Sequence, residues 1–333
     1  MTVVPAELPP LLGESPAFLA ALAHISRVAP IERPLLVIGE RGTGKELAAA
    51  RIHYLSRRWD RPFVKVNCAA LPETLLDSEL FGFEAGAFTG ASRRHAGRFE
   101  QADGGTLFLD EVATASAAVQ EKLLRAVEYG EIERIGGRTQ RVDVRVVGAT
   151  NADLPAMAAA GTFRPDLLDR LAFDVVRLPP LRERPEDIEP LAEHFARGMV
   201  RELERPYFPG FTEEALAALR AHPWPGNVRE LRNAVERSVA AADAESPVDT
   251  VILDPFSRSA ALTPPSVPPA PPVEDAEPRA GGPLTERVRA FEAELLRAAL
   301  ARNRHNQRRT AESLGLGYHQ LRGLLRKHGL VGR

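Results

Sequence analysis

Short apolar runs rich in β-branched residues alternate with amphipathic stretches along roughly the first half of the chain. The runs are residues 35–39 (LLVIG), 63–67 (FVKVN), 106–110 (TLFLD), 144–150 (VRVVGAT) and 173–178 (FDVVRL). Strand-length apolar runs that alternate with helical periodicity are typical of βαβ units. The pattern therefore predicts an α/β domain whose mainly parallel sheet is covered by helices.

The pattern changes at Pro179 and Pro180, where the strand-like runs end. Residues 186–241 carry apolar side chains at helical spacing, with a break at residues 223–226 (PWPG). We expect an α/β core over residues 11–178 and a helical subdomain over residues 179–242. Residues 1–10 are expected to be a short tail, too short for a sensor domain.

The remaining chain reads as a tether followed by a small helical domain. Residues 264–283 contain eight prolines and few large apolar side chains, so residues 243–283 are expected to form a semi-stiff linker. Residues 285–302 form an amphipathic helical pattern, Asn306 can cap a second helix, and Gly315 separates that helix from a third. Two short helices joined by a turn that contains glycine predict a helix-turn-helix within residues 284–333.

Charge is distributed unevenly between these regions. The whole chain carries 43 Lys and Arg against 45 Asp and Glu, a net charge of -2, which excludes a generic polycation. Residues 284–333 carry 11 Lys and Arg against 4 Asp and Glu, a net of +7, which leaves -9 on the rest. A local basic surface of this kind indicates contact with nucleic acid, although a basic bundle without such a role would carry the same charge.

Seven residues of the second and third predicted helices of this small domain are the candidates for DNA contact. The basic members are Arg308, Arg309, Arg322, Arg326 and Lys327, and the start of the final helix adds His319 and Gln320. In a helix-turn-helix the second helix enters the major groove, so we expect His319, Gln320 and Arg322 to read bases. Some of the basic residues are expected to contact phosphate, which fixes the register on DNA without reading its sequence.

Composition also bears on the compartment. One cysteine cannot form an internal disulfide, and no apolar run approaches the roughly 18 residues of a membrane helix. The first residues have no basic segment followed by an apolar one. We therefore expect a soluble protein of the reducing cytoplasm.

A phosphate-binding loop follows the first apolar run. The residues Gly39, Glu40, Arg41, Gly42, Thr43, Gly44 and Lys45 match G-x-x-x-x-G-K and open a helical stretch. Glycines let backbone N–H groups surround an anion, the helix N-terminus adds positive potential, and the lysine reaches the terminal phosphates. The next residue is Glu46 rather than Ser or Thr, so a magnesium ligand must come from elsewhere or act through water.

Polar residues at the ends of three other apolar runs complete a candidate hydrolytic site. Asp110 and Glu111 end residues 106–111, where the first can hold magnesium and the second can polarise an attacking water. Asn151 is suited to sensing the terminal phosphate. Asn67 is expected to hydrogen-bond Glu111, although both asparagines would also serve as simple strand-end caps.

Two further features stand outside this arrangement. Arg164 and Arg170, in FRPDLLDRL, are candidates to neutralise the charge that develops during phosphoryl transfer, from the position of a neighbouring subunit. The glycines of residues 86–91 flank an aromatic and a hydroxyl residue, a composition that favours a mobile contact loop over a plain surface hairpin.

Several stretches together resemble one protein family. Residues 86–91 read GAFTGA, and the other stretches are GERGTGKE, VNCAALPETLLDSELFG, GGTLFLDE, TFRPDLLDRL, LPPLRER and WPGNVREL. Through them, residues 11–240 closely resemble the AAA+ central domain of bacterial enhancer-binding proteins, the activators of sigma-54 RNA polymerase, in which the GKE ending is usual. Residues 284–333 resemble the Fis-type helix-turn-helix domain, whose first helix dimerises.

The resemblance implies a fold, an activity and partners. The fold is an AAA+ P-loop NTPase core with a helical lid, and the active form is a homo-oligomeric ring, expected to be a hexamer, with ATP and Mg²⁺ at subunit interfaces. It assigns Lys45 to phosphate binding, Asp110 to Mg²⁺, Glu111 to water activation, Asn67 to a switch, Arg164 and Arg170 to trans-acting fingers, and Arg229 to a nucleotide sensor. It assigns sigma-54 contact to Gly86, Ala87, Phe88, Thr89, Gly90 and Ala91, with Phe88 and Thr89 at the tip.

Within the family, the stretches RIHYLSRRW and NADLPAM and the final helix resemble the branch that activates phage shock operons. That branch is held down by a PspA-like peripheral membrane inhibitor. Trp59 lies in a charged stretch and would suit an exposed inhibitor contact, although its ring would equally pack on its own domain.

The expected function is ATP-driven remodelling of the sigma-54 RNA polymerase closed complex into an open complex, from upstream enhancer DNA. Activation of the phage shock operon is the first expectation, and another sigma-54 regulon is the alternative. A nucleotide-sensing repressor without remodelling activity and an AAA+ unfoldase are rival functions, and the GAFTGA stretch and the helix-turn-helix pattern disfavour both.

Overall fold

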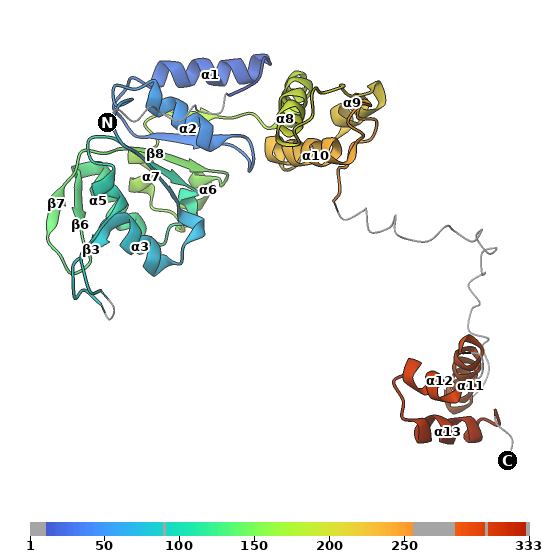
Figure 1. Ribbon diagram of the computed structural model, residues 1–333. Helices are drawn as coiled ribbons and strands as arrows, with labels where there is room; N and C mark the ends of the chain where they lie inside the picture. Colours follow the sequence, from blue (N-terminus) through green and yellow to red (C-terminus); the bar gives the residue numbers. More distant parts are fainter. Residues whose placement is uncertain (1–10, 89–90, 256–283, 304–305, 331–333) are drawn as a thin grey trace. The chain divides into compact units, whose positions relative to one another are not determined.

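The computed structural model describes residues 11–88, 91–255, 284–303 and 306–330. The chain divides into two compact units, Met1–Ser259 and Ala260–Arg333 (Figure 1). The first contains the predicted α/β core and the helical subdomain, and the second contains the predicted helix-turn-helix.

The core is built on one parallel sheet. Its strands are β1 (Leu35–Ile38), β2 (Phe63–Asn67), β5 (Thr106–Asp110), β8 (Arg145–Thr150) and β9 (Val175–Arg177). They lie in the order β2-β5-β8-β1-β9, and every neighbouring pair is parallel. The five apolar runs thus form the predicted sheet, and the carboxyl ends of the strands meet at one edge.

Helices cover both faces of this sheet. One face packs against α1 (Pro16–Val28) and α2 (Lys45–Tyr54). The other packs against α3 (Glu73–Phe81), α4 (Arg98–Gln101), α5 (Ala117–Tyr129), α6 (Leu154–Ala159) and α7 (Pro165–Leu171). Within β1, Leu35 and Val37 belong to the hydrophobic cluster on the face covered by α1 and α2, and Leu36 belongs to the cluster on the opposite face. A strand buried on both faces explains why the sequence reads as continuous apolar runs.

Two short antiparallel hairpins stand outside the parallel sheet, and the hydrophobic pattern does not predict their strands. They are β3 (Gly82–Phe83) with β4 (His95–Ala96), and β6 (Glu131–Glu133) with β7 (Thr139–Arg141). The first carries residues 84–94, which include the GAFTGA stretch. Strands of two or three residues give too short an alternation to be predicted from the hydrophobic pattern.

The helical subdomain, called the lid below, consists of α8 (Ile188–Glu202), α9 (Glu213–Ala221) and α10 (Asn227–Ala241). Short helices η3 (Leu181–Glu183) and η4 (Pro185–Asp187) connect it to β9. Trp224, from the predicted break, is fully buried, and its Nε1 donates to the carbonyl of Leu219 at 2.8 Å.

The lid extends beyond the boundary expected at residue 242. Val248, Val251 and Leu253 pack against its hydrophobic cluster. The backbone N–H of Ile252 donates to Ser238 Oγ at 2.8 Å, and Arg237 donates to the carbonyls of Ile252 and Leu253. Residues up to 253 therefore belong to the lid rather than to the linker. The later part of that predicted linker, 256–283, lies outside the described residues.

The second unit contains α11 (Leu284–Arg302), α12 (Gln307–Ser313) and α13 (Tyr318–Lys327). The Asn306 side chain accepts from the backbone N–H groups of Arg308 and Arg309, and Gly315 adopts φ +66°, as the predicted cap and break require. Leu296, Leu300, Leu321 and Leu325 form its hydrophobic core. Across both units, none of the described helices is long and apolar enough to span a membrane.

Candidate functional site

The predicted phosphate loop joins β1 to α2 and lines a cavity of about 860 Å³. Gly42 and Gly44 adopt φ +78° and +100°, conformations that favour glycine. Lys45 is 7% exposed, and its Nζ donates to the carbonyls of Gly39 at 2.9 Å and Glu40 at 3.3 Å. Burial lowers the pKa of Lys45, while Glu111 and Asp110 act to raise it. A buried cation beside a glycine-rich loop and the start of a helix is suited to binding phosphate.

The two carboxylates at the end of β5 face this loop. Glu111 Oε1 lies 4.0 Å from Lys45 Nζ, and the Glu111 backbone has φ +52°, a left-handed conformation that turns the chain sharply after the strand. The Asp110 Oδ1 atom accepts the Glu111 backbone N–H at 3.1 Å. The strand end thus presents both carboxylates to the cavity, and both belong to its lining.

Asn67 contacts a different carboxylate from the one expected. Its Nδ2 donates to Asp110 Oδ2 at 3.4 Å, rather than to Glu111, and its Oδ1 accepts the Ala69 backbone N–H, which caps the 3-10 helix Cys68–Ala70. The strand register explains the correction, because β2 and β5 pair Asn67 directly with Asp110.

The donor set fits Mg²⁺. Mg²⁺ in nucleotide sites is held by one or two carboxylates together with phosphate oxygens and waters, and Asp110 and Glu111 supply that number. Glu46 is engaged elsewhere, because its Oε1 accepts Lys65 Nζ at 2.8 Å. Asp110 is therefore a better candidate for a Mg²⁺ ligand than Glu46. In the described parts of the chain, no group of three or more acidic, histidine or cysteine side chains is arranged to hold a metal ion.

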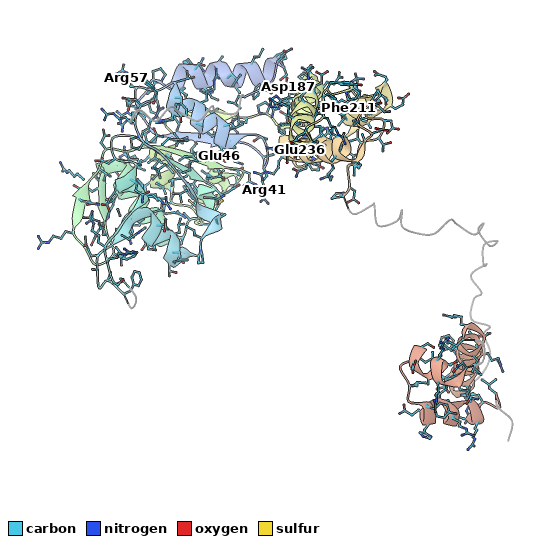
Figure 2. All side chains as sticks on the ribbon, viewed as in Figure 1. Arg41, Glu46, Arg57, Asp187, Phe211 and Glu236 are labelled. Atoms are coloured by element: carbon cyan, nitrogen blue, oxygen red, sulfur yellow. The ribbon has the colours of Figure 1, made fainter. Side chains whose placement is uncertain are left out.

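The cavity continues between the core and the lid, and the apolar residues of this wall were not predicted. Arg41 and Glu46 mark its core side and Glu236 its lid side (Figure 2). Its apolar part comprises Leu11, Leu12, Leu191, Phe195 and Val228, and its polar part includes Asn151, His194 and Arg229. Asp187 holds the segment that follows Leu11 and Leu12 against the start of the lid. Its buried carboxylate accepts hydrogen bonds from the backbone N–H groups of Glu14 and Ser15 and from the Ser15 hydroxyl.

An apolar wall opposite a phosphate loop suits a purine base. The residues that build it lie far apart in the sequence and carry no local motif. Their signal in the sequence was the resemblance of two stretches. LPPLRER precedes α8, and WPGNVREL spans the start of α10 and contains Val228.

The structure brings most of the predicted nucleotide-site residues together, but four lie elsewhere. The cavity lining includes residues 41–46, Asn67, Asp110, Glu111, Asn151 and Arg229. Gly39 and Glu40 are absent from it, and the Glu40 carboxylate contacts the lid instead. Arg164 pairs with Asp166 at 2.8 Å and Arg170 with Glu128 at 2.7 Å, both away from the cavity of their own chain.

The hairpin that carries residues 84–94 exposes Phe88, one of the predicted contact residues that the structure describes. Phe88 is 48% exposed and meets Phe83 edge-on at 4.9 Å between ring centroids, whereas Ala91 is buried. Arg134 anchors the base by donating to Glu84 at 2.5 Å and to Glu100 at 2.7 Å. Gly86 and Ala87 belong to the same turn, while Thr89 and Gly90 lie outside the described residues.

All seven candidates for DNA contact are exposed on α12 and α13. Two of them have a structural role in addition. Gln320 Oε1 accepts the Gly317 backbone N–H at 3.0 Å and so caps α13, and Lys327 pairs with Glu292 of α11 at 3.2 Å. Arg308 lies over the Tyr318 ring at 6.0 Å. His319, Arg309, Arg322 and Arg326 are the members whose exposed side chains best suit contact with DNA.

Trp59 lies on the surface of the core, between α2 and β2, and its side chain is 59% exposed. A largely exposed indole leaves its apolar area for a partner. The exposure favours the contact interpretation over a ring packed on its own domain.

Comparison with protein families assigns most of the chain to three domains. Residues 11–177 match the sigma-54 interaction domain, residues 182–263 match the AAA+ ATPase lid domain, and residues 287–328 match the bacterial regulatory protein, Fis family.

Individual proteins are similar over nearly the full length. The chain is 58% identical over 324 residues to the Psp operon transcriptional activator of Escherichia coli K12, which covers 96% of this chain and 97% of that protein. It is 46% identical to the hydrogenase transcriptional regulatory protein HoxA of Cupriavidus necator, over 92% of this chain and 62% of that protein. The crystal structure of NtrX from Brucella abortus in complex with ATP superposes with a TM-score of 0.68 at 37% identity, over 96% of this chain and 70% of that chain.

Proposed function

The chain belongs to the sigma-54-dependent transcriptional activators, and from that premise we propose that it activates a phage shock operon. It is an AAA+ ATPase joined to a Fis-type DNA-binding domain. The observation that carries the operon assignment is the 58% identity, over nearly both full lengths, to the Psp operon transcriptional activator. This agrees with the resemblance to the phage-shock-operon activator PspF in the sequence motifs.

ATP is hydrolysed in the cavity that the phosphate loop lines. The loop amides and Lys45 bind the terminal phosphates, and the apolar wall with Leu12 and Phe195 receives the base. Glu111, freed from Lys45 once phosphate engages that lysine, orients and deprotonates the attacking water. Asp110 would hold Mg²⁺, which neutralises charge on the phosphate oxygens when bound.

The chain works as a ring, expected to be a hexamer. Arg164 and Arg170 lie outside the cavity of their own chain, where a neighbouring subunit's nucleotide would meet them. A carboxylate holds each guanidinium in place, Asp166 for the first and Glu128 for the second. In the ring these arginines neutralise charge that develops on the transferred phosphoryl group.

The hairpin with Phe88 engages sigma-54. Its base is fixed to the core by Arg134, and its exposed tip offers an aromatic ring on a glycine-flanked turn. When the nucleotide is hydrolysed, this hairpin moves as a unit and remodels the closed promoter complex.

Two other surfaces bind other partners. The helix α13 holds the upstream DNA, and the exposed Trp59 binds a PspA-like inhibitor.

The test separates hydrolysis from remodelling. Phe88→Ala keeps the nucleotide cavity intact, so we expect ATP turnover within about twofold of wild type and loss of sigma-54 binding in the presence of ATP. Leu75→Ala, which removes another exposed apolar side chain of the core, is the matched control and should keep both. Sigma-54 binding by Phe88→Ala at wild-type affinity would refute the contact role.

The operon assignment has its own test. The purified chain should protect DNA upstream of the phage shock operon of its own genome in a footprinting assay, and deletion of its gene should abolish induction of that operon. Protection only upstream of unrelated sigma-54 promoters would favour the alternative regulon.

A further inference from the structure

Glu40 belongs to the phosphate loop but does not line the cavity, and its side chain contacts Arg182 and Asn227 instead. Its two oxygens accept the Arg182 guanidinium in a bidentate pair, at 2.6 and 2.8 Å, and Oε2 also accepts Asn227 Nδ2 at 3.1 Å. The Arg182 and Asn227 hydrogen bonds lower the pKa of Glu40 to about 2, so the carboxylate is ionised at neutral pH. A loop residue is thereby tied to the connector that follows β9 and to the first residue of α10.

Asn227 joins three segments through one amide. It is fully buried, and its φ of +54° is a left-handed conformation that asparagine tolerates better than most residues. Its Nδ2 donates to Glu40 and to the carbonyl of Arg41 at 3.0 Å, and its Oδ1 accepts the Leu181 backbone N–H at 2.7 Å. This buried amide bonds the phosphate loop and the connector from the first residue of α10, and so fixes the three segments relative to one another.

Gly42 shows how closely the lid sits on the loop. A Cβ atom at this position would lie 2.2 Å from the Gly226 carbonyl oxygen and 3.1 Å from Arg229 Cβ. The absence of a side chain at Gly42 therefore leaves room for the lid as well as for phosphate. Arg229, two residues after Asn227, lines the cavity from this same turn.

We propose that Glu40 and Asn227 are positioning residues that hold the first turn of α10, and with it Arg229, against the phosphate loop. When nucleotide fixes the loop, Glu40 and the Arg41 carbonyl carry that constraint to Asn227 and so to the lid. The catalytic groups themselves do not touch either side chain. This inference rests on the proposed ATPase function of the cavity, which it deepens.

The test compares Glu40→Gln and Asn227→Ala with Glu193→Gln in the full-length chain. Glu193 pairs with Arg197 on the exposed side of α8, so its variant removes a lid carboxylate without touching the loop. We expect kcat for ATP to fall about threefold in Glu40→Gln and about tenfold in Asn227→Ala, from the loss of an exposed ion pair and of buried hydrogen bonds respectively. KM should change less than about twofold, and Glu193→Gln should match wild type.

Hydrogen exchange with ADP supplies the readout that a purely structural role would not move. In the wild type, ADP should slow exchange of both the loop amides 42–47 and the lid amides 228–233. In Glu40→Gln and Asn227→Ala, ADP should slow exchange of the loop amides alone. The melting temperature of ligand-free Glu40→Gln should stay near that of the wild type. Lid protection that survives in both variants would overturn the proposal. A wild-type chain that binds ADP but hydrolyses no ATP would instead refute the proposed function, and the exchange comparison would still decide the coupling.

Discussion

Asn67 and Asp110 end two neighbouring parallel strands in register, and the amide of one donates to the carboxylate of the other at 3.4 Å. The contact places a neutral donor on the carboxylate expected to hold Mg²⁺, while Glu111 remains beside Lys45 at 4.0 Å. A change that moves Asn67 should therefore alter the position of the Asp110 carboxylate directly and that of the Glu111 carboxylate only indirectly.

Asn67→Ala should lower ATP turnover about tenfold, with a smaller change in KM, because one hydrogen bond that orients Asp110 is lost. Steady-state kinetics at saturating Mg²⁺ measure this. Asn67→Asp keeps the oxygen that caps Ala69 but places a second carboxylate beside Asp110. It should be at least as impaired, and wild-type turnover in Asn67→Asp would show that only the cap matters.

Mixing two inactive variants tests the trans position of Arg170. Lys45→Ala removes phosphate binding but keeps the finger, and Arg170→Ala keeps the cavity but loses the finger. Each alone should be nearly inactive, while an equimolar mixture should recover measurable ATPase, since intact cavities then face intact fingers. A mixture no more active than its components would place Arg170 outside the composite site.

His53 makes the stability of the core depend on pH. It is 1% exposed, its Nδ1 lies 3.0 Å from Thr106 Oγ1, and its ring stacks on Phe63. Burial, reinforced by the charge of Arg145, lowers the pKa of His53 from 6.5 to about 4. Between these values the unfolded chain binds the proton more strongly, so this stabilising contribution is complete above pH 6.5 and is lost as the pH falls towards 4.

We expect His53 to account for about 2 kcal/mol of the loss in unfolding free energy between pH 7 and pH 5. Urea unfolding at the two pH values measures this loss. His53→Gln cannot acquire a charge at this position, so its loss should be smaller than that of the wild type by about that amount. Equal losses in the two proteins would contradict the assignment.

Arg322→Ala should weaken binding to the specific upstream DNA site about tenfold or more, because an arginine at the start of α13 is placed to contact base edges. Arg302→Ala removes an exposed arginine from the end of α11 and serves as the charge-matched control. Titrations at several salt concentrations, on specific and unrelated DNA, separate the two roles. Equal weakening on both DNAs would make Arg322 a phosphate contact only.

The sequence was sufficient for the features that local chemistry determines. The apolar runs predicted the five parallel strands, because a strand buried on both faces needs apolar residues throughout, as Leu35, Leu36 and Val37 illustrate. The phosphate loop, the strand-end carboxylates and the Asn306 cap follow from residue types at fixed spacings. These features lie within a few residues of the groups they serve.

The sequence was insufficient where partners lie far apart along the chain. It could not show that Asn67 faces Asp110, because that depends on which strands are neighbours and on their register. From the sequence, Glu40 was expected to bind nucleotide, whereas its carboxylate accepts a hydrogen bond from Asn227, which is 187 residues away. The lid was expected to end at residue 242 because the polar stretch before Val248 looks like linker, although hydrogen bonds from α10 hold residues 252 and 253 on the lid.

Open-complex formation on linear promoter DNA tests the central claim most directly. Sigma-54 holoenzyme, the purified chain and ATP should give permanganate-reactive, melted DNA. A non-hydrolysable ATP analogue, or the Glu111→Gln variant with ATP, should give none while nucleotide binding persists. Melted DNA in either of these two controls, or none with the wild-type chain while it hydrolyses ATP, would contradict the account.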